Sequence, residues 1–333
     1  MIVPHDSVWI ACRIKEMGHG TQPHPISEGS LGGAIPGPLW KRGTVSFARG
    51  GLALAGGLPL PEMRRAEHCI VGPRRLFQCN ACRRQTSPMA GTIFNSTKLP
   101  LTVWFRAMYL VTQTKQGISS IELGRRLGVT QTTAWKIKTK LAEVMRAVGD
   151  EEKLAGRIEM DDTYLGGERS GGKHGRGSPG KKPIIVAVQT DEKGRPRRIK
   201  LRRIARFKRR RVKSLTKRII MPGSTIVTDG YQCFRGVADA GCTHVRITTG
   251  CGRQAALHPA FKWVNTMLGN IKASLVGTYR AIRKKHVVRY LAEFEWRFNN
   301  RFDLAAMIPA LGRAAATSKP MTYGDLRMAD YGA

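Results

Sequence analysis

The sequence predicts a mixed α/β fold built around a sheet, and two observations lead to this prediction. From about residue 151 onward, short β-prone runs alternate with segments of helical period. Two of these runs end in an aspartate, Asp161 and Asp229, before a break that contains glycine. An acidic residue at such a strand end can hold a divalent metal beside a phosphate. We therefore expect a sheet with a metal-binding edge.

The charge of the chain indicates its partner. It has 57 Lys and Arg against 23 Asp and Glu, a formal net charge of +34 over 333 residues. Such a field attracts polyanions, and binding of this kind weakens steeply with salt. Double-stranded DNA is the expected partner; acidic lipid and ribosomal RNA are the alternatives.

Length and composition narrow the class of protein. The length allows two or three domains, and 41% hydrophobic residues suffice to form cores. The sequence has no apolar run of the roughly 18 residues that span a membrane, and residues 1–10 do not resemble a signal peptide. Seven cysteines with one close pair do not form a secreted disulfide framework. We expect a bacterial cytoplasmic protein associated with the nucleoid and no membrane partner.

The N-terminal third divides into two segments. Residues 1–66 are rich in Gly and Pro without periodicity, which predicts a disordered or misassigned N-terminal extension. In residues 67–95, Cys79 and Cys82 form a C-x₂-C knuckle, half of a zinc ribbon. Upstream, Cys69 is the candidate third zinc ligand. His68 is available as a fourth, but two adjacent residues have poor geometry for binding the same metal ion. The segment is either a zinc site or a degenerate ribbon without metal.

Residues 96–150 are predicted to form a helix-turn-helix region. It begins with a largely buried helix at 101–114, and the helix-turn-helix itself follows. Ser119 or Ser120 caps a short helix, Gly128 allows a turn, and Thr130 caps a second helix. An ordinary helical hairpin is the alternative. In a helix-turn-helix, the second helix would present five residues to the major groove and its phosphates. They are Gln131, Thr132, Thr133, Lys136 and Lys140.

Residues 151–312 predict a β-β-β-α-β-α-β-α order of elements, which is the order of the ribonuclease H-like fold. The expected strands are 157–161, Lys182–Thr190, 197–204, 224–228 and 245–247. The expected helices lie near 212–219, after Tyr231, and at 260–275 and 285–300. Residues 313–333 are expected to form a C-terminal tail.

In that topology the first and fourth strands are parallel neighbours, so Asp161 and Asp229 lie together. Two carboxylates about 4 Å apart repel by around 4 kcal/mol at an effective dielectric of 20, which divalent cations relieve. Alternation along the strand predicts that Asp162 points to the opposite face and that Glu159 shares the face of Asp161. The alternative is that both aspartates only form turns.

With these features the chain resembles the DDE-type insertion-sequence transposases with an ISXO-type transposase domain. The resemblance covers about residues 68–312 and rests on Cys79-x-x-Cys82-RRQTS, AGTI from Ala90, EMDDTYLGG from Glu159, TDGY from Thr228, WVNT from Trp263, GTY from Gly277 and YLAEFEWRFNNR from Tyr290. It implies a polynucleotidyl transferase that binds terminal inverted repeats and uses Mg²⁺ or Mn²⁺ to cut and join DNA. It also implies a homo-oligomer on DNA.

The family has Glu or Asn as its third metal ligand, and residues 258–280 contain no carboxylate. The resemblance therefore implies an Asp-Asp-Asn set of Asp161, Asp229 and Asn270, with Asn265 as the rival for the third position. Glu293 and Glu295 either add an acidic group or form salt bridges.

Further basic residues are candidate DNA contacts. Residues 166–177 almost match a phosphate-binding P-loop, but His174 stands where Ser or Thr is required and the loop joins two strands, so ATP binding is not expected. We expect a flexible DNA-contacting loop with Lys173 and Arg176. Lys272 and the basic runs 195–203 and 206–211 are candidates for contacts with the DNA backbone, with solvated faces as the alternative.

The expected function is thus metal-dependent DNA transposition. A catalytically inactive relic or DNA-binding regulator is the main alternative, and a nuclease for structured nucleic acid on the same fold is a third.

Overall fold

The computed structural model describes residues 68–73, 76–166, 181–249, 258–279 and 283–328. All of them belong to one compact unit, Leu39–Ala333. The predicted extension 1–66 and the loop with Lys173 and Arg176 lie outside the described residues. None of the helices in the described ranges is long and apolar enough to cross a membrane.

The cysteine-bearing segment forms a small antiparallel sheet in the order β1-β2-β3. Its strands are β1 (His68–Val71), β2 (Leu76–Cys79) and β3 (Gln85–Thr86). After Cys79 the chain turns, and the backbone N–H of Arg83 donates to the Cys79 carbonyl at 3.0 Å. Arg83 adopts a positive φ of 59° in this turn.

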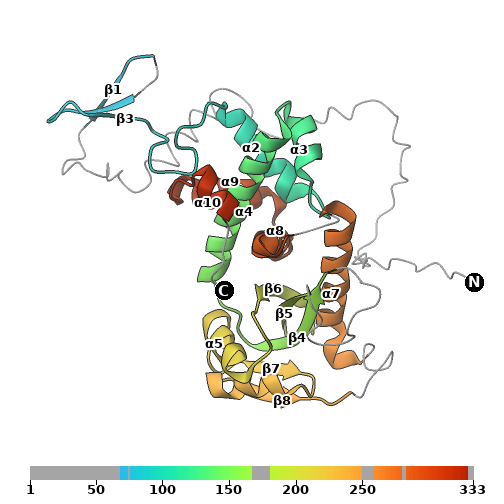
Figure 1. Cartoon of the computed structure of the whole chain (residues 1–333). Helices are drawn as coiled ribbons and strands as arrows, with labels where there is room; N and C mark the ends of the chain where they lie inside the picture. The colour runs from blue at the N-terminus through green and yellow to red at the C-terminus, as the bar shows by residue number, and fades with distance from the viewer. Residues whose placement is uncertain (1–67, 74–75, 167–180, 250–257, 280–282, 329–333) are drawn as a thin grey trace, which may run out of the picture. The chain divides into compact units, whose positions relative to one another are not determined.

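Three helices follow (Figure 1). Their buried side chains share one hydrophobic core. They are α2 (Leu101–Gln113), α3 (Ser120–Leu127) and α4 (Gln131–Glu151). The expected caps are confirmed: Ser119 Oγ accepts the Glu122 N–H, and Thr130 Oγ1 accepts the Thr133 N–H. Gly128, at φ 68°, ends α3 in the left-handed region, where glycine is favoured.

The second sheet has five strands in the order β6-β5-β4-β7-β8. They are β4 (Arg157–Leu165), β5 (Lys182–Thr190), β6 (Pro196–Arg203), β7 (Thr225–Thr228) and β8 (Thr243–Arg246). Strand β5 is antiparallel to β4 and β6, whereas β4, β7 and β8 run parallel. The expected parallel pairing of the first and fourth strands is thus confirmed.

Alternating residues of the strands supply two separate cores, one on each face of the sheet. Helix α5 (Arg209–Ile219) and the 3₁₀ segment η2 (Gln232–Ala240) cover the face of Ile158 and Met160. Helices α7 (Lys262–Ser274) and α8 (Val287–Asn299) cover the face of Val227.

Short segments connect these helices, and two helices end the described chain. They are η3 (Pro259–Phe261), the π-helical turn η4 (Leu275–Tyr279), η5 (Lys284–His286), α9 (Leu304–Thr317) and α10 (Tyr323–Met328). The expected boundary at residue 312 falls inside α9. On either side of this boundary, Leu311 and Ala315 pack into the core shared with α2 and α4.

Candidate metal centre

Three aspartates converge where β4 passes the end of β7. The parallel register ends at Glu159 opposite Val227, and its continuation places Asp161 level with Asp229. Asp161, Asp162 and Asp229 each contribute a carboxylate oxygen, and these oxygens lie within 4.8 Å of one another. Within the described ranges this is the one group of three or more His, Cys, Asp or Glu side chains arranged to hold a metal ion.

Backbone contacts orient two of these carboxylates. Asp229 Oδ1 accepts the Tyr231 N–H at 3.0 Å, which closes a turn directly after β7. Asp161 Oδ1 accepts the Asp162 N–H at 2.8 Å. The hydroxyl of the preceding Thr228, which is fully buried, is 2.8 Å from His244 Nε2 on β8. Burial lowers the pKa of His244, and the charge of Arg246 lowers it further.

The chemistry of this arrangement favours a hard divalent cation. All three side chains are half-buried carboxylates, and unit charges about 4 Å apart repel by around 4 kcal/mol at an effective dielectric of 20. Carboxylate oxygens are the preferred ligands of Mg²⁺ and Mn²⁺. The three aspartates therefore fit one or two such ions, which would offset their mutual repulsion.

The expectation that Asp162 points away from this centre is wrong. Strand β4 continues to Leu165, but its pairing with β7 ends at Glu159. Beyond that point the edge of β4 facing Asp229 is open, so side chains from both faces can turn toward it. The sequence indicates this arrangement by its two consecutive aspartates, Asp161 and Asp162. Strict alternation along a strand places them on opposite faces and so predicts otherwise.

Glu159 connects the central strand to α7. It shares the strand face of Asp161, as expected, and is 1% exposed. Its Oε2 accepts the backbone N–H groups of Trp263 and Val264, at 2.9 and 3.0 Å. These N–H groups belong to the first turn of α7, where a carboxylate also complements the helix dipole. Glu159 thus fixes the start of α7 against the strand that carries Asp161 and Asp162.

Replacing Glu159 with alanine is expected to destabilise the protein by about 2–4 kcal/mol, because one buried and one partly buried N–H group lose their acceptor. Glu159→Gln retains an acceptor oxygen and is expected to lose less than half as much. Urea unfolding of the two variants measures both losses. Equal stability of Glu159→Ala and wild type would show that the contact contributes nothing.

Asn265 and Asn270 both lie on α7 but on opposite flanks of it. Val264, Met267, Leu268 and Ile271 form the buried face, and successive helical residues are about 100° apart. On this geometry Asn270 shares a flank with Trp263, whose indole N–H donates to the Gly194 carbonyl in the turn between β5 and β6. Asn265 and Lys272 share the other flank.

The three predicted zinc ligands do not gather into one group in the described part of the chain. Cys69 lies on β1, is exposed, and its thiol donates to the Gln78 carbonyl at 3.8 Å. Cys79 ends β2 and is buried, whereas Cys82 is exposed in the following turn. The zinc site remains a prediction.

The five predicted groove-reading residues of α4 have different surroundings. Thr132 and Lys136 are exposed, and the Lys136 ammonium lies 4.8 Å from the ring centre of Tyr323. Thr133 is occupied by the helix cap with Thr130. The Lys140 ammonium donates to the Ile93 carbonyl at 2.9 Å, and burial lowers its pKa. Lys140 therefore supports the fold rather than an exposed surface.

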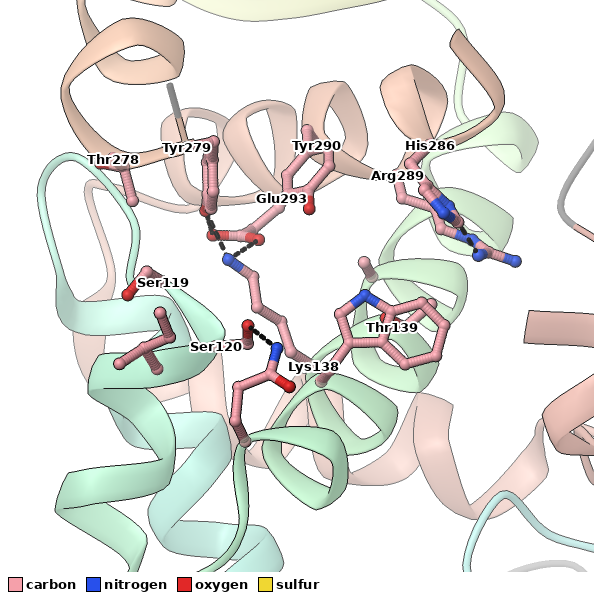
Figure 2. A pocket seen from close by; sticks show the side chains of 14 residues that line it. Ser119, Ser120, Lys138, Thr139, Thr278, Tyr279, His286, Arg289, Tyr290 and Glu293 are labelled. Carbon is pink, nitrogen blue, oxygen red and sulfur yellow. Dashed lines mark hydrogen bonds and ion pairs between the residues drawn. The ribbon is translucent and has the colours of Figure 1, made fainter. Parts of the chain in front are cut away.

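Gln131 lies at a pocket of about 380 Å³ between the N-terminal turns of α3 and α4 and the start of α8. Its side-chain amide donates to Ser120 Oγ at 2.9 Å. Figure 2 shows Lys138, Tyr279 and Glu293 meeting across this pocket. The Lys138 ammonium is 3.1 Å from Glu293 Oε2, and the Tyr279 hydroxyl donates to Glu293 Oε1 at 3.0 Å.

The two glutamates of α8 form buried salt bridges, as one of the two interpretations expected. Burial raises the pKa of Glu293, but Lys138 and Arg297 lower it more, so it is held below its usual value. Glu295 accepts from Arg202 at 2.6 Å and lies 3.1 Å from the Lys200 ammonium. Glu293 thus joins α8 to α4, and Glu295 joins it to β6.

The basic run 195–203 is therefore only partly available to DNA. Lys200 is 0% exposed and Arg202 is 7% exposed, and Arg198 pairs with Glu152. Lys200 and Arg202 both neutralise the carboxylate of Glu295. These two residues therefore form salt bridges inside the protein instead of the expected contacts with the DNA backbone.

Sequence comparison identifies the domain that holds the three aspartates. Residues 153–299 match the family model of the ISXO2-like transposase domain. This range contains the complete five-stranded sheet, the aspartate cluster and α7. Over these residues the chain is similar to the ISXO2-like transposase domain, and its resemblance to insertion-sequence transposases is confirmed.

Among solved structures, the chain is similar to two of Mos1 transposase. One is a Mos1 transposase paired-end complex with left transposon end, at 10% identity, covering 62% of this chain and 78% of that one, with a TM-score of 0.20. The other is a Mos1 mariner paired end complex with Mn, at 11% identity, covering 58% and 74%, with a TM-score of 0.19. Scores this low do not establish a common fold. No curated protein sequence matches the chain significantly.

Proposed function

We propose that this protein is a DNA transposase that binds the ends of a mobile element and catalyses metal-dependent cleavage and joining of DNA strands. The observation that carries the proposal is the convergence of Asp161 and Asp229 at neighbouring parallel strands inside the transposase domain. The strongly positive net charge of +34 supports a polyanionic substrate.

The strand order and directions support a ribonuclease H-like assignment for this domain. Three antiparallel strands in sequence, followed by two strands parallel to the first, give the observed order β6-β5-β4-β7-β8. Helices cover both faces of the sheet. In this arrangement β7 ends beside the middle of the central strand β4, and the carboxylates meet there.

In the proposed mechanism, Asp161 and Asp229 hold the metal and Asp162 supplies a further carboxylate beside them. Bound Mg²⁺ or Mn²⁺ would activate the attacking hydroxyl and stabilise the leaving oxygen of the phosphodiester. Glu159 positions α7 relative to these carboxylates through the backbone of Trp263 and Val264. The exposed cation Lys272 would bind a DNA phosphate.

For the third ligand, the helix geometry favours Asn265 over the first-choice residue Asn270. Asn265 lies on the flank of α7 opposite to that of Trp263, and we infer that this flank faces β7 and the Asp229 that follows it. Asn270 lies on the flank of Trp263, which reaches the turn between β5 and β6. An amide oxygen is a ligand for a hard cation, although it brings no charge.

Asn265→Ala is expected to raise the Mg²⁺ concentration for half-maximal cleavage by about tenfold or more, the size of effect that lost metal-site contacts produce. Asn265→Asp, which adds a charge, is expected to lower it. Asn270→Ala is the matched control and is expected to shift it by less than about twofold. The reverse order of the two alanine variants would assign the ligand to Asn270.

We further propose that the N-terminal turn of α4 reads the terminal repeats, with Thr132 and Lys136 as its exposed contacts. Gln131 would have to exchange its bond to Ser120 for a base edge. The zinc site of Cys69, Cys79 and Cys82 and a homo-oligomer on paired ends complete the proposal.

A joining assay tests the proposed function. Labelled duplexes that carry the element end are incubated with a target plasmid and Mg²⁺, and joined product is expected only with the metal. Binding without cleavage or joining would favour the inactive relic or regulator. Cleavage of branched duplexes without end-specific joining would favour the nuclease.

A further inference from the structure

The outer face of α5 is a dense surface of positive charge. The helix has 11 residues with no acidic side chain. Val212, Leu215, Thr216 and Ile219 face the core. Its cations lie on the remaining face and flanks, and they are Arg209, Arg210, Arg211, Lys213, Lys217 and Arg218.

Only a small part of this charge is neutralised within the described part of the chain. Arg209 forms a two-point salt bridge with Asp239 on η2, at 2.6 and 2.7 Å. Asp239 also interacts with the charge of Lys213. In the described ranges no ion pair involves the other four cations of α5. The Lys153 ammonium, which donates to the Lys217 carbonyl at 3.0 Å, adds a further positive charge.

The placement of these cations is unfavourable for the helix itself. Lys208 is the N-cap residue and three arginines follow it, so the first turn places positive charge where the helix dipole favours negative charge. Like charges one turn apart, such as Arg210 and Lys213, also repel. A polyanion bound at this surface would relieve both effects.

The contrast with β6 shows that the basic runs of this chain serve different purposes. On β6, Lys200 and Arg202 are buried against Glu295. On α5, the cations have no such buried partner among the described residues, and Arg210, Arg211, Lys217 and Arg218 are exposed.

We propose that the exposed face of α5 binds the backbone of a second DNA duplex, the target into which an element end is joined; this inference rests on the proposed function. The duplex that α4 is proposed to bind lies on another side of the domain. Helix α8 lies between the N-terminal half of α4 and the sheet, because Glu293 pairs with Lys138 of α4 and Glu295 pairs with β6. It is the C-terminal end of α4 that contacts β6 itself, through Gly149 and Asp150. Helix α5 covers the opposite face of that sheet (Figure 1).

The chemistry of the surface predicts binding that is independent of sequence. Arginine and lysine at a helix surface contact phosphates, which fix position without reading bases. Sequence-independent capture suits a target site, whereas the element ends require readout by base contacts.

The test is a triple variant, Arg210→Gln/Arg211→Gln/Lys217→Gln, which keeps good helix formers at exposed positions. The control variant, Lys98→Gln/Arg313→Gln/Lys319→Gln, removes the same charge from exposed positions elsewhere. Affinity for a random-sequence duplex and for the element-end duplex is measured by fluorescence anisotropy between 50 and 300 mM salt, and cleavage and joining are measured separately.

For the α5 variant, the slope of log affinity against log salt for the random duplex is expected to fall by about 2.7, which is about 0.9 for each of three lost phosphate contacts. Joining to the target is expected to fall at least about tenfold, while end binding and end cleavage match the control. A slope equal to that of the control would overturn the DNA surface. Equal losses of end cleavage and joining would place the element end, not the target, on α5. The affinity for the random duplex tests DNA binding at α5 even if the wild-type protein joins no DNA. Failure of the α5 proposal can therefore be distinguished from failure of the proposed transposase activity.

Discussion

Replacing Asp161 or Asp229 with asparagine is expected to reduce Mg²⁺-dependent strand cleavage by about a thousandfold or more. One unit charge at about 4 Å contributes around 4 kcal/mol at an effective dielectric of 20, and each 1.36 kcal/mol is a factor of ten in rate. Affinity for the element-end duplex is expected to remain within about twofold, because the proposed groove contacts lie on α4. Cleavage and anisotropy assays on the same preparations measure both quantities.

Two controls separate loss of the metal from loss of the fold. Glu192→Gln removes one negative charge from the exposed turn between β5 and β6, and it is expected to cleave like wild type. Without divalent metal, Asp161→Asn and Asp229→Asn should be at least as stable as wild type, because each relieves repulsion inside the cluster. A large loss of stability in either variant would indicate a turn-forming role instead.

Replacing Glu295 with glutamine is expected to cost about 3–5 kcal/mol of the free energy of unfolding, because one partner is removed from a buried ion cluster. The side chains of Lys200, Arg202 and Glu295 are 0%, 8% and 4% exposed. Glu295 also accepts the Leu201 N–H at 2.9 Å. Burial lowers the pKa of Lys200 while Glu295 raises it, so loss of Glu295 leaves a cation that is costly to keep charged. Urea unfolding measures the effect.

The exposed pair of Glu122 and Arg126 on α3 is the matched control. Its atoms approach to 2.6 Å, but its side chains are 41% and 52% exposed. Pairs of this kind contribute about 0–1 kcal/mol, so Glu122→Gln should have little effect. Similar losses for Glu122→Gln and Glu295→Gln would contradict the view that burial gives the Glu295 cluster its importance.

The order of strands and the neighbouring positions of Asp161 and Asp229 could be predicted from the sequence. The alternation of β-prone and helical segments fixed the number of elements, and the topology followed from it. The caps at Ser119 and Thr130 were also predictable, because capping depends on residues only three positions apart.

Contacts between distant residues were not predictable in this way. Glu159 reaches an N–H group 104 positions away, and Arg202 meets Glu295 across 93 positions. A basic run in the sequence looks solvated unless its buried partner is known, which is why the roles of Lys200 and Arg202 were wrongly expected. The approach of Asp162 to the cluster depends on where the β4–β7 pairing ends, and local sequence does not encode that point.

The most direct test of the metal centre is cleavage by Asp229→Cys in the presence of different metals. A thiolate is a poor ligand for Mg²⁺ and a better one for softer metals. We expect this variant to bind the element end normally, to be inactive with Mg²⁺, and to regain cleavage when Mn²⁺ or Cd²⁺ replaces Mg²⁺. Cleavage by Asp229→Cys at the wild-type rate in Mg²⁺ would contradict a role for this carboxylate in holding the metal.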